Sequence, residues 1–288
     1  MGSKTALITG STSGIGKATA IALGKAGFNL ILTGRNDNKG NKIAKKIKKK
    51  SNVEADFIKA DISSLNEVKL LADQIKNKYE SIDVLVNNAG ARFDTLKKSK
   101  DEIELTFATN YLGHFLLTLS LLDLLKNTNN TRIINVSSSS HSGIKLDLDN
   151  IINTKNYNRK TAYGQSKLAL ILFTYKLAKL LEPFNIKVNA IDPGGVATNI
   201  ARNNGLIAWL KHNVYYILKG TLISPSKAAE ALFFLAVSKD IGYITGKYFQ
   251  KMEIVKSSPE SYDDDSMEKL WETSLKLCAI NESILSLH

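Results

Sequence analysis

Cysteine, proline and long apolar runs are scarce in this sequence of 288 residues. The single cysteine, Cys278, excludes an internal disulfide and suits a reducing compartment. There is no run of about 20 apolar residues, as a transmembrane helix would need. Met1–Lys4 lead straight into a candidate strand, so an apolar leader of about 15 residues is missing as well. We therefore expect a cytoplasmic protein without a signal peptide or a membrane anchor.

Basic residues outnumber acidic ones, and the formal net charge of the chain is +12. Basic residues are spread along the chain and are dense only from Lys42 to Lys50, where Ile43 and Ile47 are spaced by one helical turn. This spacing predicts the solvated face of an amphipathic helix, and contact with an anionic partner is the alternative. No nucleic-acid-binding module or platform of aromatic and basic residues accompanies the charge. We therefore expect no nucleic-acid partner.

Short apolar runs alternate with amphipathic segments along the chain. The runs predict buried strands at 5–9, 28–33, 53–58, 82–86, 132–136, 186–191 and 246–250. Helices are expected at 14–26, through the basic run, from Ser63 or Ser64 to Tyr79, at 101–126 in one piece or two, and at 163–181 and 225–238. This alternation predicts an α/β protein, namely a single-domain Rossmann fold over residues 1–288. Its doubly wound parallel sheet has about seven strands, with helices on both faces.

A glycine-rich turn lies between the first strand and the first helix. It consists of Gly10, Ser11, Thr12, Ser13, Gly14, Ile15 and Gly16. Glycines let the backbone approach a pyrophosphate closely, and the helix N-terminus adds free N–H groups and partial positive charge. Because the strand and the helix flank the turn, the motif predicts a dinucleotide-binding site.

The end of the second strand bears on the choice of dinucleotide. An acidic residue there would hold the ribose 2′-hydroxyl, whereas this chain has Gly34 followed by Arg35. A guanidinium can meet a 2′-phosphate with a bidentate fork, so we favour NADP(H) over NAD(H). The alternatives are that Arg35 faces solvent or stacks on adenine, and nearby Asp37 complicates the interpretation.

Further polar or small residues follow other strands. Asp61 and Ile62 are placed to reach an adenine ring. Asn88, Ala89 and Gly90 follow the fourth strand, where small residues and amides let a ligand lie close to the backbone. Because the carboxyl ends of parallel strands meet at one edge of the sheet, these residues are expected to line one crevice.

Tyr163 and Lys167 are four residues apart on a predicted helix, which places both side chains on one face. A phenol has a reference pKa of about 10, and a nearby ammonium lowers it. Such a tyrosine can give a proton to a carbonyl oxygen or take one from an alcohol. A serine at the end of the fifth strand, within 137–140, would face the same crevice.

The interior of the predicted helix at 101–126 contains Asn110 and His114 among apolar residues. Asn110 is expected to be hydrogen-bonded, either as a core amide or by ordering water near the site. His114 is expected to be a packed core histidine.

Two longer segments are expected near the substrate. The polar stretch 141–161 exceeds most connections in compact domains and is expected to rim the substrate entrance. The segment at about 199–222 is rich in apolar and aromatic residues and is expected to cover the substrate, with contact to a membrane surface through 200–220 as the alternative. A C-terminal helix is expected at about 262–280.

Together these motifs resemble the short-chain dehydrogenase/reductase family. The matching residues are Thr9-Gly10-x-x-x-Gly14-Ile15-Gly16, Asn87-Asn88-Ala89-Gly90, Asn110, Ser138, Tyr163-x-x-x-Lys167 and Pro193-Gly194. The runs Gly113-His114-Phe115, Ser166-Lys167-Leu168-Ala169, Gly246-Lys247-Tyr248-Phe249 and Leu270-Trp271-Glu272 are similar to the branch of retinol dehydrogenases and the WW-domain oxidoreductase.

The resemblance implies roles for individual residues. It implies that Tyr163 is the general acid and base, and that Lys167 lowers its pKa and holds the nicotinamide ribose. It implies that Ser138 positions the substrate oxygen, with Ser137 or Ser139 as alternatives, and that Asn110 anchors a water linked to Lys167. By the same resemblance, the cofactor carboxamide is contacted by Pro193, Gly194, Val196 and Thr198.

We therefore expect an NADP(H)-dependent oxidoreductase that interconverts a lipophilic aldehyde or ketone and its alcohol, with no metal. The alternative is a non-catalytic NADP(H)-binding scaffold or sensor, which the presence of both Tyr163 and Lys167 disfavours. The family resemblance also implies a homodimer or homotetramer.

Overall fold

A computed structural model describes residues 3–154, 156–196 and 222–281 of the chain. The expected segment at 199–222 lies almost wholly outside these residues, and so does Thr198. Among the described residues, no helix is both long and apolar enough to cross a bilayer.

The described chain forms one sheet of eight strands, in the order β3-β2-β1-β4-β5-β6-β7-β8. The strands are β1 (Thr5–Thr9), β2 (Asn29–Gly34), β3 (Ala55–Lys59), β4 (Val84–Asn87), β5 (Arg132–Val136), β6 (Lys187–Asp192), β7 (Lys247–Gln250) and β8 (Glu253–Val255). All neighbours are parallel except β7 and β8. The predicted doubly wound parallel sheet is confirmed, with one antiparallel edge strand beyond the seven expected.

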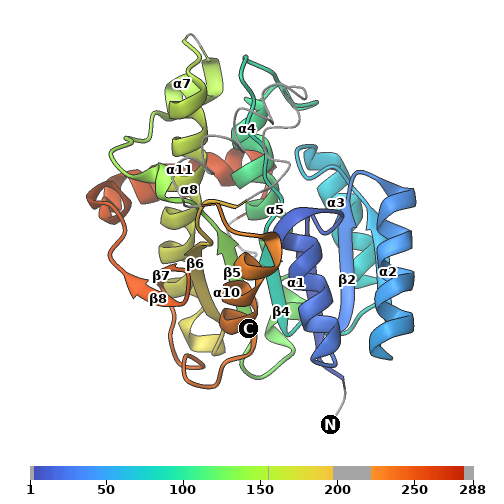
Figure 1. Cartoon of the computed structure of the whole chain (residues 1–288). Helices are drawn as coiled ribbons and strands as arrows, with labels where there is room; N and C mark the ends of the chain where they lie inside the picture. The colour runs from blue at the N-terminus through green and yellow to red at the C-terminus, as the bar shows by residue number, and fades with distance from the viewer. Residues whose placement is uncertain (1–2, 155, 197–221, 282–288) are drawn as a thin grey trace.

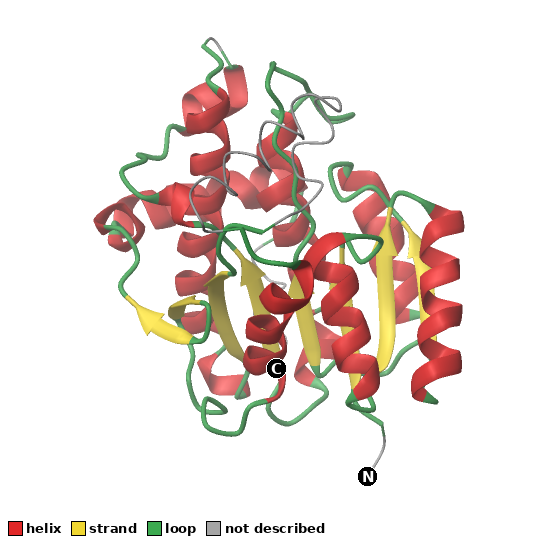
Figure 2. Ribbon diagram, in the orientation of Figure 1, coloured by secondary structure: helices red, strands yellow, loops and turns green. Residues whose placement is uncertain are grey.

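Helices cover both faces of the sheet (Figures 1 and 2). One face carries α1 (Gly14–Lys25), α2 (Asp37–Ser51) and α10 (Pro225–Val237). The other carries α3 (Leu65–Lys76), α5 (Gly113–Ser120) and α8 (Arg159–Leu180), with α11 (Asp264–Cys278) packed on α8. Shorter elements are α4 (Leu105–Phe107), η1 (Ala108–Leu112), α6 (Leu122–Lys126), η2 (Ser139–His141), α7 (Leu148–Asn153), η3 (Glu182–Phe184) and η5 (Pro259–Tyr262).

The basic helix α2 has the face pattern that the sequence predicts. Ile43 and Ile47 are buried against the sheet, whereas Lys45, Lys46 and Lys49 are exposed. Burial of the two isoleucines accounts for the position of the helix, and the lysine charge is left in water, where it is well solvated.

The predicted helix at 101–126 is wrong at its start, whereas the expected alternative of two pieces is confirmed. It begins only at Leu105, because the Glu104 carboxylate accepts hydrogen bonds from the backbone N–H groups of Thr106 and Phe107, both at 2.8 Å. Asp101 instead accepts from the Leu65 N–H at 2.9 Å and so joins this segment to α3. The chain then passes through the π-helical turn η1 before α5, and α6 follows after a break.

Helix α8 starts four residues before the expected Tyr163. The Asn158 side chain caps it by accepting from the N–H groups of Lys160 and Thr161, at 2.9 and 3.2 Å. The polar stretch 141–161 thus contains α7 and the first turn of α8. Tyr163 consequently stands in the second turn of α8, where the backbone is fixed on both sides.

The start of α3 shapes the loop after β3. Ser64 is the cap, and its hydroxyl accepts from the Glu67 N–H at 3.4 Å. The Glu67 carboxylate accepts from the Asp61 N–H at 2.8 Å, and Ser63 donates its hydroxyl proton to the Asp61 carboxylate at 2.8 Å. The capping groups therefore also hold Asp61 in place.

The backbone at the start of α5 lies very close to the loop after β3. A Cβ atom on Gly113 would stand 1.8 Å from the Ile62 carbonyl oxygen. Behind it, Tyr111, Phe115, Phe173 and Trp271 form a cluster of rings, with the Phe115 and Trp271 centroids 5.2 Å apart. This cluster joins η1 and α5 to α8 and α11, the elements that support the site.

Arg132 secures the end of α10 from inside the sheet. Its guanidinium donates to the carbonyl oxygens of Leu235 at 2.9 Å and Ser238 at 2.7 Å, and the residue is buried. A cation at a helix C-terminus also complements the helix dipole.

We expect Arg132→Met to lower the free energy of unfolding by about 2–4 kcal/mol, because two charge-assisted hydrogen bonds are lost. Urea unfolding followed by circular dichroism measures the change. Lys179→Met is the control, since its pair with Asp264 spans 3.5 Å and both side chains are more than two-thirds exposed, at 69% and 78%. That control should change stability by less than about 0.5 kcal/mol, and equal effects of the two substitutions would contradict the assignment.

Candidate active site

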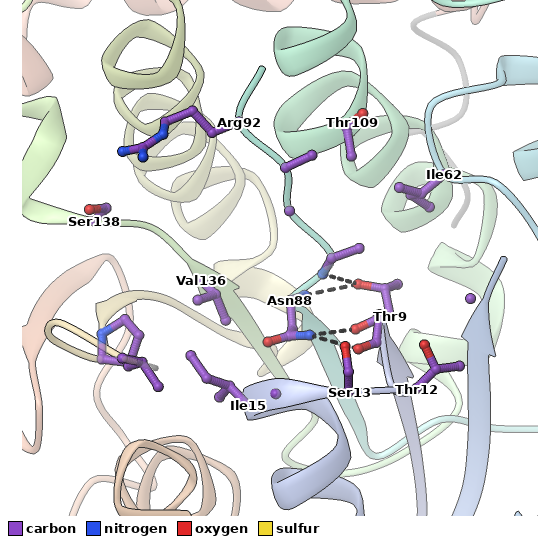
Figure 3. A pocket seen from close by; sticks show the side chains of 18 of the residues that line it. Thr9, Thr12, Ser13, Ile15, Ile62, Asn88, Arg92, Thr109, Val136 and Ser138 are labelled. Atoms are coloured by element: carbon purple, nitrogen blue, oxygen red, sulfur yellow. Dashed lines mark hydrogen bonds between the residues drawn. The ribbon is translucent and has the colours of Figure 1, made fainter. Parts of the chain in front are cut away.

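A cleft of about 510 Å³ lies along the carboxyl ends of the strands. Figure 3 shows part of its wall, with residues that come from both halves of the chain. The expected site residues that line it are Gly10, Thr12, Ser13, Gly14, Ile15, Arg35, Asp61, Ile62, Asn88, Ala89, Gly90, Ser138, Tyr163, Lys167, Pro193, Gly194 and Val196. Three others lie behind the wall, namely Ser11, Gly16 and Asn110.

The glycine-rich turn is tightly packed against the loop after β4. A Cβ atom on Gly16 would stand 2.4 Å from the Asn88 side-chain nitrogen and 2.6 Å from the Gly10 carbonyl oxygen. Ser11 is buried and donates its hydroxyl proton to the Thr33 carbonyl oxygen at 3.1 Å. These two residues thus shape the turn from behind, and neither forms part of the cleft surface.

The Thr9 hydroxyl joins β1 to this loop. Its oxygen accepts from the backbone N–H groups of Asn88 and Ala89, both at 2.9 Å, and the Asn88 side chain donates to the Thr9 carbonyl oxygen at 2.8 Å (Figure 3). The end of β1, which leads into the glycine-rich turn, is therefore hydrogen-bonded to the loop after β4 as one unit.

His114 connects this unit to η1. Its Nδ1 lies 2.9 Å from the Asn110 carbonyl oxygen, and its Nε2 lies 2.9 Å from Thr9 Oγ1. A carbonyl oxygen only accepts, so Nδ1 carries the proton and Nε2 accepts from the Thr9 hydroxyl. Burial lowers the pKa of His114 to about 4, which keeps the ring neutral in this tautomer. The expected core histidine thus also supports the cleft.

Asn110 is fully buried in η1, and its side chain bonds to protein groups. Its oxygen accepts from the Ala91 N–H at 2.7 Å, and its nitrogen donates to the Ala91 carbonyl oxygen at 3.0 Å and to Ser166 Oγ at 2.9 Å. The side chain therefore fixes the loop that follows Gly90. These bonds confirm that Asn110 is a hydrogen-bonded core amide, and its ordering of water near the site stays a prediction.

Tyr163 and Lys167 stand on one face of α8, with Lys167 Nζ 5.7 Å from the centre of the tyrosine ring. The ammonium is buried and donates to the Val136 carbonyl oxygen at 2.8 Å. Burial lowers the pKa of Lys167 to about 8, and the Asp192 carboxylate opposes part of that shift. A partly desolvated positive charge therefore lies beside the phenol.

The serines after β5 differ in what they face. Ser137 lines the cleft but donates its hydroxyl proton to the Lys167 carbonyl oxygen at 2.9 Å. Ser138 lines the cleft beyond it. Its hydroxyl oxygen accepts from the Ser140 N–H at 3.2 Å, and its proton is donated to another cleft hydroxyl, Ser140 Oγ, over the longer distance of 3.3 Å. Ser139 donates its N–H to the Asp192 carboxylate at 3.0 Å. Ser138 therefore has the better-placed hydroxyl for a ligand.

Basic residues gather at the other end of the cleft. Arg35 and Lys39 both line it, with Asn36 between them as the cap of α2. Asp37 is not among the lining residues, because its carboxylate accepts from the Asn41 side chain at 2.8 Å. The acidic residue that complicated the sequence interpretation is thus turned to its own helix.

The segment after β6 is shaped by the Asp192 carboxylate. It accepts from the Gly194 N–H at 2.9 Å and, as described, from the N–H of Ser139. This carboxylate therefore ties the ends of β5 and β6 together. Sequence pattern carries no signal for the Ser139 partner, since it follows a different strand.

Several lining residues were not singled out from the sequence. They are Thr33, Asn36, Lys39, Ala60, Ala91, Arg92, Thr109, Val136, Asp192 and Gly195. The strand-end rule would have found those that follow β2, β4 and β6, whereas Thr109 reaches the cleft only because η1 runs beside it.

The family model of the short chain dehydrogenases matches residues 4–206. The chain belongs to this family. The short-chain dehydrogenase is 36% identical to human retinol dehydrogenase 13, over 96% of this chain and 85% of the relative. It is 33% identical to human polyprenol dehydrogenase, over 96% of this chain and 86% of that protein. The resemblance to the retinol dehydrogenase branch is thereby confirmed.

The fold is shared with solved structures. L-sorbose reductase from Gluconobacter frateurii, complexed with NADPH and L-sorbose, aligns with a TM-score of 0.70 and 22% identity, over 90% of this chain and 97% of that chain. The short-chain dehydrogenase is an oxidoreductase by family, and its family uses a nicotinamide dinucleotide.

The neutral state of His114 gives a pH prediction. The unfolded histidine titrates near 6.5 and the folded one at about 4, so the unfolded chain binds more protons in that interval. The stabilisation due to neutral His114 should therefore be complete above about pH 6.5 and decline towards pH 4.

The measurement compares wild type with His114→Gln by urea unfolding from pH 7 to pH 4. The difference in unfolding free energy between the two proteins should shrink by about 3 kcal/mol over this range. A difference that does not depend on pH would contradict the neutral tautomer.

Proposed function

We propose that this short-chain dehydrogenase is an NADP(H)-dependent oxidoreductase that interconverts a lipophilic aldehyde or ketone and the corresponding alcohol. One observation carries the proposal, namely that Tyr163, the buried Lys167 ammonium and Ser138 line the same end of one cleft. The remaining lining residues suit the binding of a dinucleotide along the strand ends.

The chain's own residues fit the cofactor. The N-terminus of α1 and the turn from Gly10 to Gly16 offer N–H groups to a pyrophosphate, and Asp61 and Ile62 flank the adenine position. Gly90, Pro193 and Gly194 leave room at the nicotinamide end. When bound, the nicotinamide supplies or accepts the hydride.

Tyr163 moves the proton in this proposal. In reduction its hydroxyl donates to the substrate oxygen, while Ser138 donates a hydrogen bond to the same oxygen. The Lys167 ammonium favours the phenolate that remains on Tyr163, because an opposite charge stabilises the charged form. Burial strengthens this effect, since water does not screen it. Asp192 and the Val136 carbonyl oxygen keep the ammonium in place.

The preference for NADP(H) rests on Arg35 and Lys39. Both line the adenosine end of the cleft, and no acidic residue of β2 faces it among the described lining residues. A 2′-phosphate between two cations gains charge-assisted hydrogen bonds that a 2′-hydroxyl lacks.

A lipophilic substrate is supported by the names of the relatives, which act on retinol and on polyprenol. The apolar segment at 199–222, which lies almost wholly outside the described residues, is the expected cover. The cytoplasmic location, membrane contact through 200–220 and assembly as a dimer or tetramer stay predictions. The non-catalytic scaffold is the second candidate, and intact Tyr163 and Lys167 argue against it.

We expect Tyr163→Phe to lower kcat at least about 100-fold, because the proton donor is lost. NADPH absorbance at saturating all-trans-retinal, nonanal or a steroid ketone measures turnover, and NADPH fluorescence measures binding. The Kd for NADPH should stay within about twofold, since Phe keeps the ring. Turnover retained by the variant would refute the assignment, and absence of turnover by wild type with every carbonyl of the panel would favour the scaffold.

We expect Arg35→Leu and Lys39→Met each to raise the KM for NADPH about tenfold, with the KM for NADH unchanged, because only the 2′-phosphate contact is lost. Lys46→Met is the matched control, as it lies exposed on α2 away from the cleft. A preference of wild type for NADH would overturn the NADP(H) proposal.

A further inference from the structure

The histidine that follows the serine turn links two distant segments. His141 Nδ1 lies 2.7 Å from the Ser138 carbonyl oxygen, and His141 Nε2 accepts a hydrogen bond from the Ser258 N–H at 3.0 Å. Ser258 precedes η5 and is more than one hundred residues further along the chain. The ring thus bridges the backbone of the serine turn and the backbone of the C-terminal segment.

The polarity of both contacts is fixed. A carbonyl oxygen accepts and a backbone N–H donates, so Nδ1 carries the proton and Nε2 holds the lone pair. Only one neutral tautomer satisfies both partners. His141 is buried, and its ring packs edge-on against Tyr248 of β7 with centroids 5.1 Å apart. Packing therefore holds the ring in the orientation that both hydrogen bonds need.

The far partner is itself firmly held. The Ser258 carbonyl oxygen accepts from the Ser261 hydroxyl at 2.6 Å and from the Ser261 N–H at 3.0 Å. The neighbouring Ser257 hydroxyl lies 2.6 Å from the Tyr175 hydroxyl on α8, the helix that carries Tyr163. The C-terminal segment is thus fixed to the catalytic helix by one contact and to the serine turn by another.

The near partner is the residue proposed to orient the substrate oxygen. The Ser138 carbonyl oxygen accepts from both the His141 ring and the His141 N–H, the latter at 3.2 Å. Movement of this peptide would displace the Ser138 hydroxyl in the cleft. Displacements near 1 Å are enough to lower catalysis by about 100-fold.

We propose that His141 is a positioning residue that couples the C-terminal segment to the Ser138 turn, so that docking of residues 256–262 holds the Ser138 hydroxyl in register with Tyr163. The catalytic part of this inference rests on the proposed function. The mechanical part, a link between 256–262 and 137–142, stands on the contacts alone.

Two substitutions separate the halves of the link. In His141→Asn the amide nitrogen occupies the place of Nδ1 and keeps the bond to Ser138, but nothing reaches Ser258. In His141→Gln the amide oxygen reaches towards the Ser258 N–H, while the bond to Ser138 is lost. Tyr248→Phe is the control, because it keeps the ring against His141 and removes only a hydroxyl.

Hydrogen exchange with mass spectrometry tests the link without any substrate. In His141→Asn, peptides covering 256–262 should exchange faster, and peptides covering 137–142 should also exchange faster although their own hydrogen bond is kept. If 137–142 stays as protected as in wild type, the coupling is overturned. The Tyr248→Phe control should match wild type in both regions.

Kinetics with NADPH and the best carbonyl of the panel test the catalytic part. Both His141 variants should lower kcat by about tenfold or more, with the KM for NADPH within about twofold of wild type. Unchanged kcat in His141→Asn would overturn the positioning role. If wild type reduces no carbonyl at all, the proposed function fails, while the exchange result still decides the link.

Discussion

The Thr9 hydroxyl accepts two backbone N–H groups from the loop after β4 and donates its proton to His114, so three separate segments meet at one oxygen. Its hydrogen-bonding capacity is fully used, since an oxygen of this kind has two lone pairs and one proton. The segments joined by this oxygen are β1, the loop after β4 and α5, which carries His114. The walls of the cleft are consequently positioned by buried contacts inside the sheet edge, before any ligand contributes.

The charge of Lys167 in the cleft is also held by groups at the ends of strands. Lys167 is held by the Val136 carbonyl oxygen and balanced in part by Asp192, whose carboxylate also ties β5 to β6. The interaction of this ammonium with nearby charges is only weakly screened, because little water surrounds it. The ammonium is also held in position, because its partners belong to strands. Lys167, Asp192 and the ends of strands β5 and β6 therefore hold one another in place.

Local pattern predicted much of this molecule. Apolar runs gave the strands β1 and β5 with their bounds, and the rule that ligands lie at strand ends brought Gly10, Arg35, Asn88 and Ser138 to one cleft. The failures involve partners distant in sequence. The start of α4 depends on Glu104 bonding ahead and Asp101 bonding to α3, β8 is a short edge strand with exposed residues, and His114 meets Thr9 across 105 positions. Periodicity carries no information on such pairs.

The π-helical turn η1 changes the direction in which the side chains after it point, relative to those before it. Each residue advances an α-helix by about 100°, and a π-turn takes one residue more than an α-turn does. Side chains after the turn are therefore rotated by about that angle relative to an uninterrupted helix. Asn110 consequently faces the loop after Gly90, while Phe115 meets Phe173 and Trp271 in the core. The extra residue of the π-turn thus lets one helical segment direct Asn110 to the loop after Gly90 and Phe115 to the aromatic core, two directions that an uninterrupted α-helix would not combine.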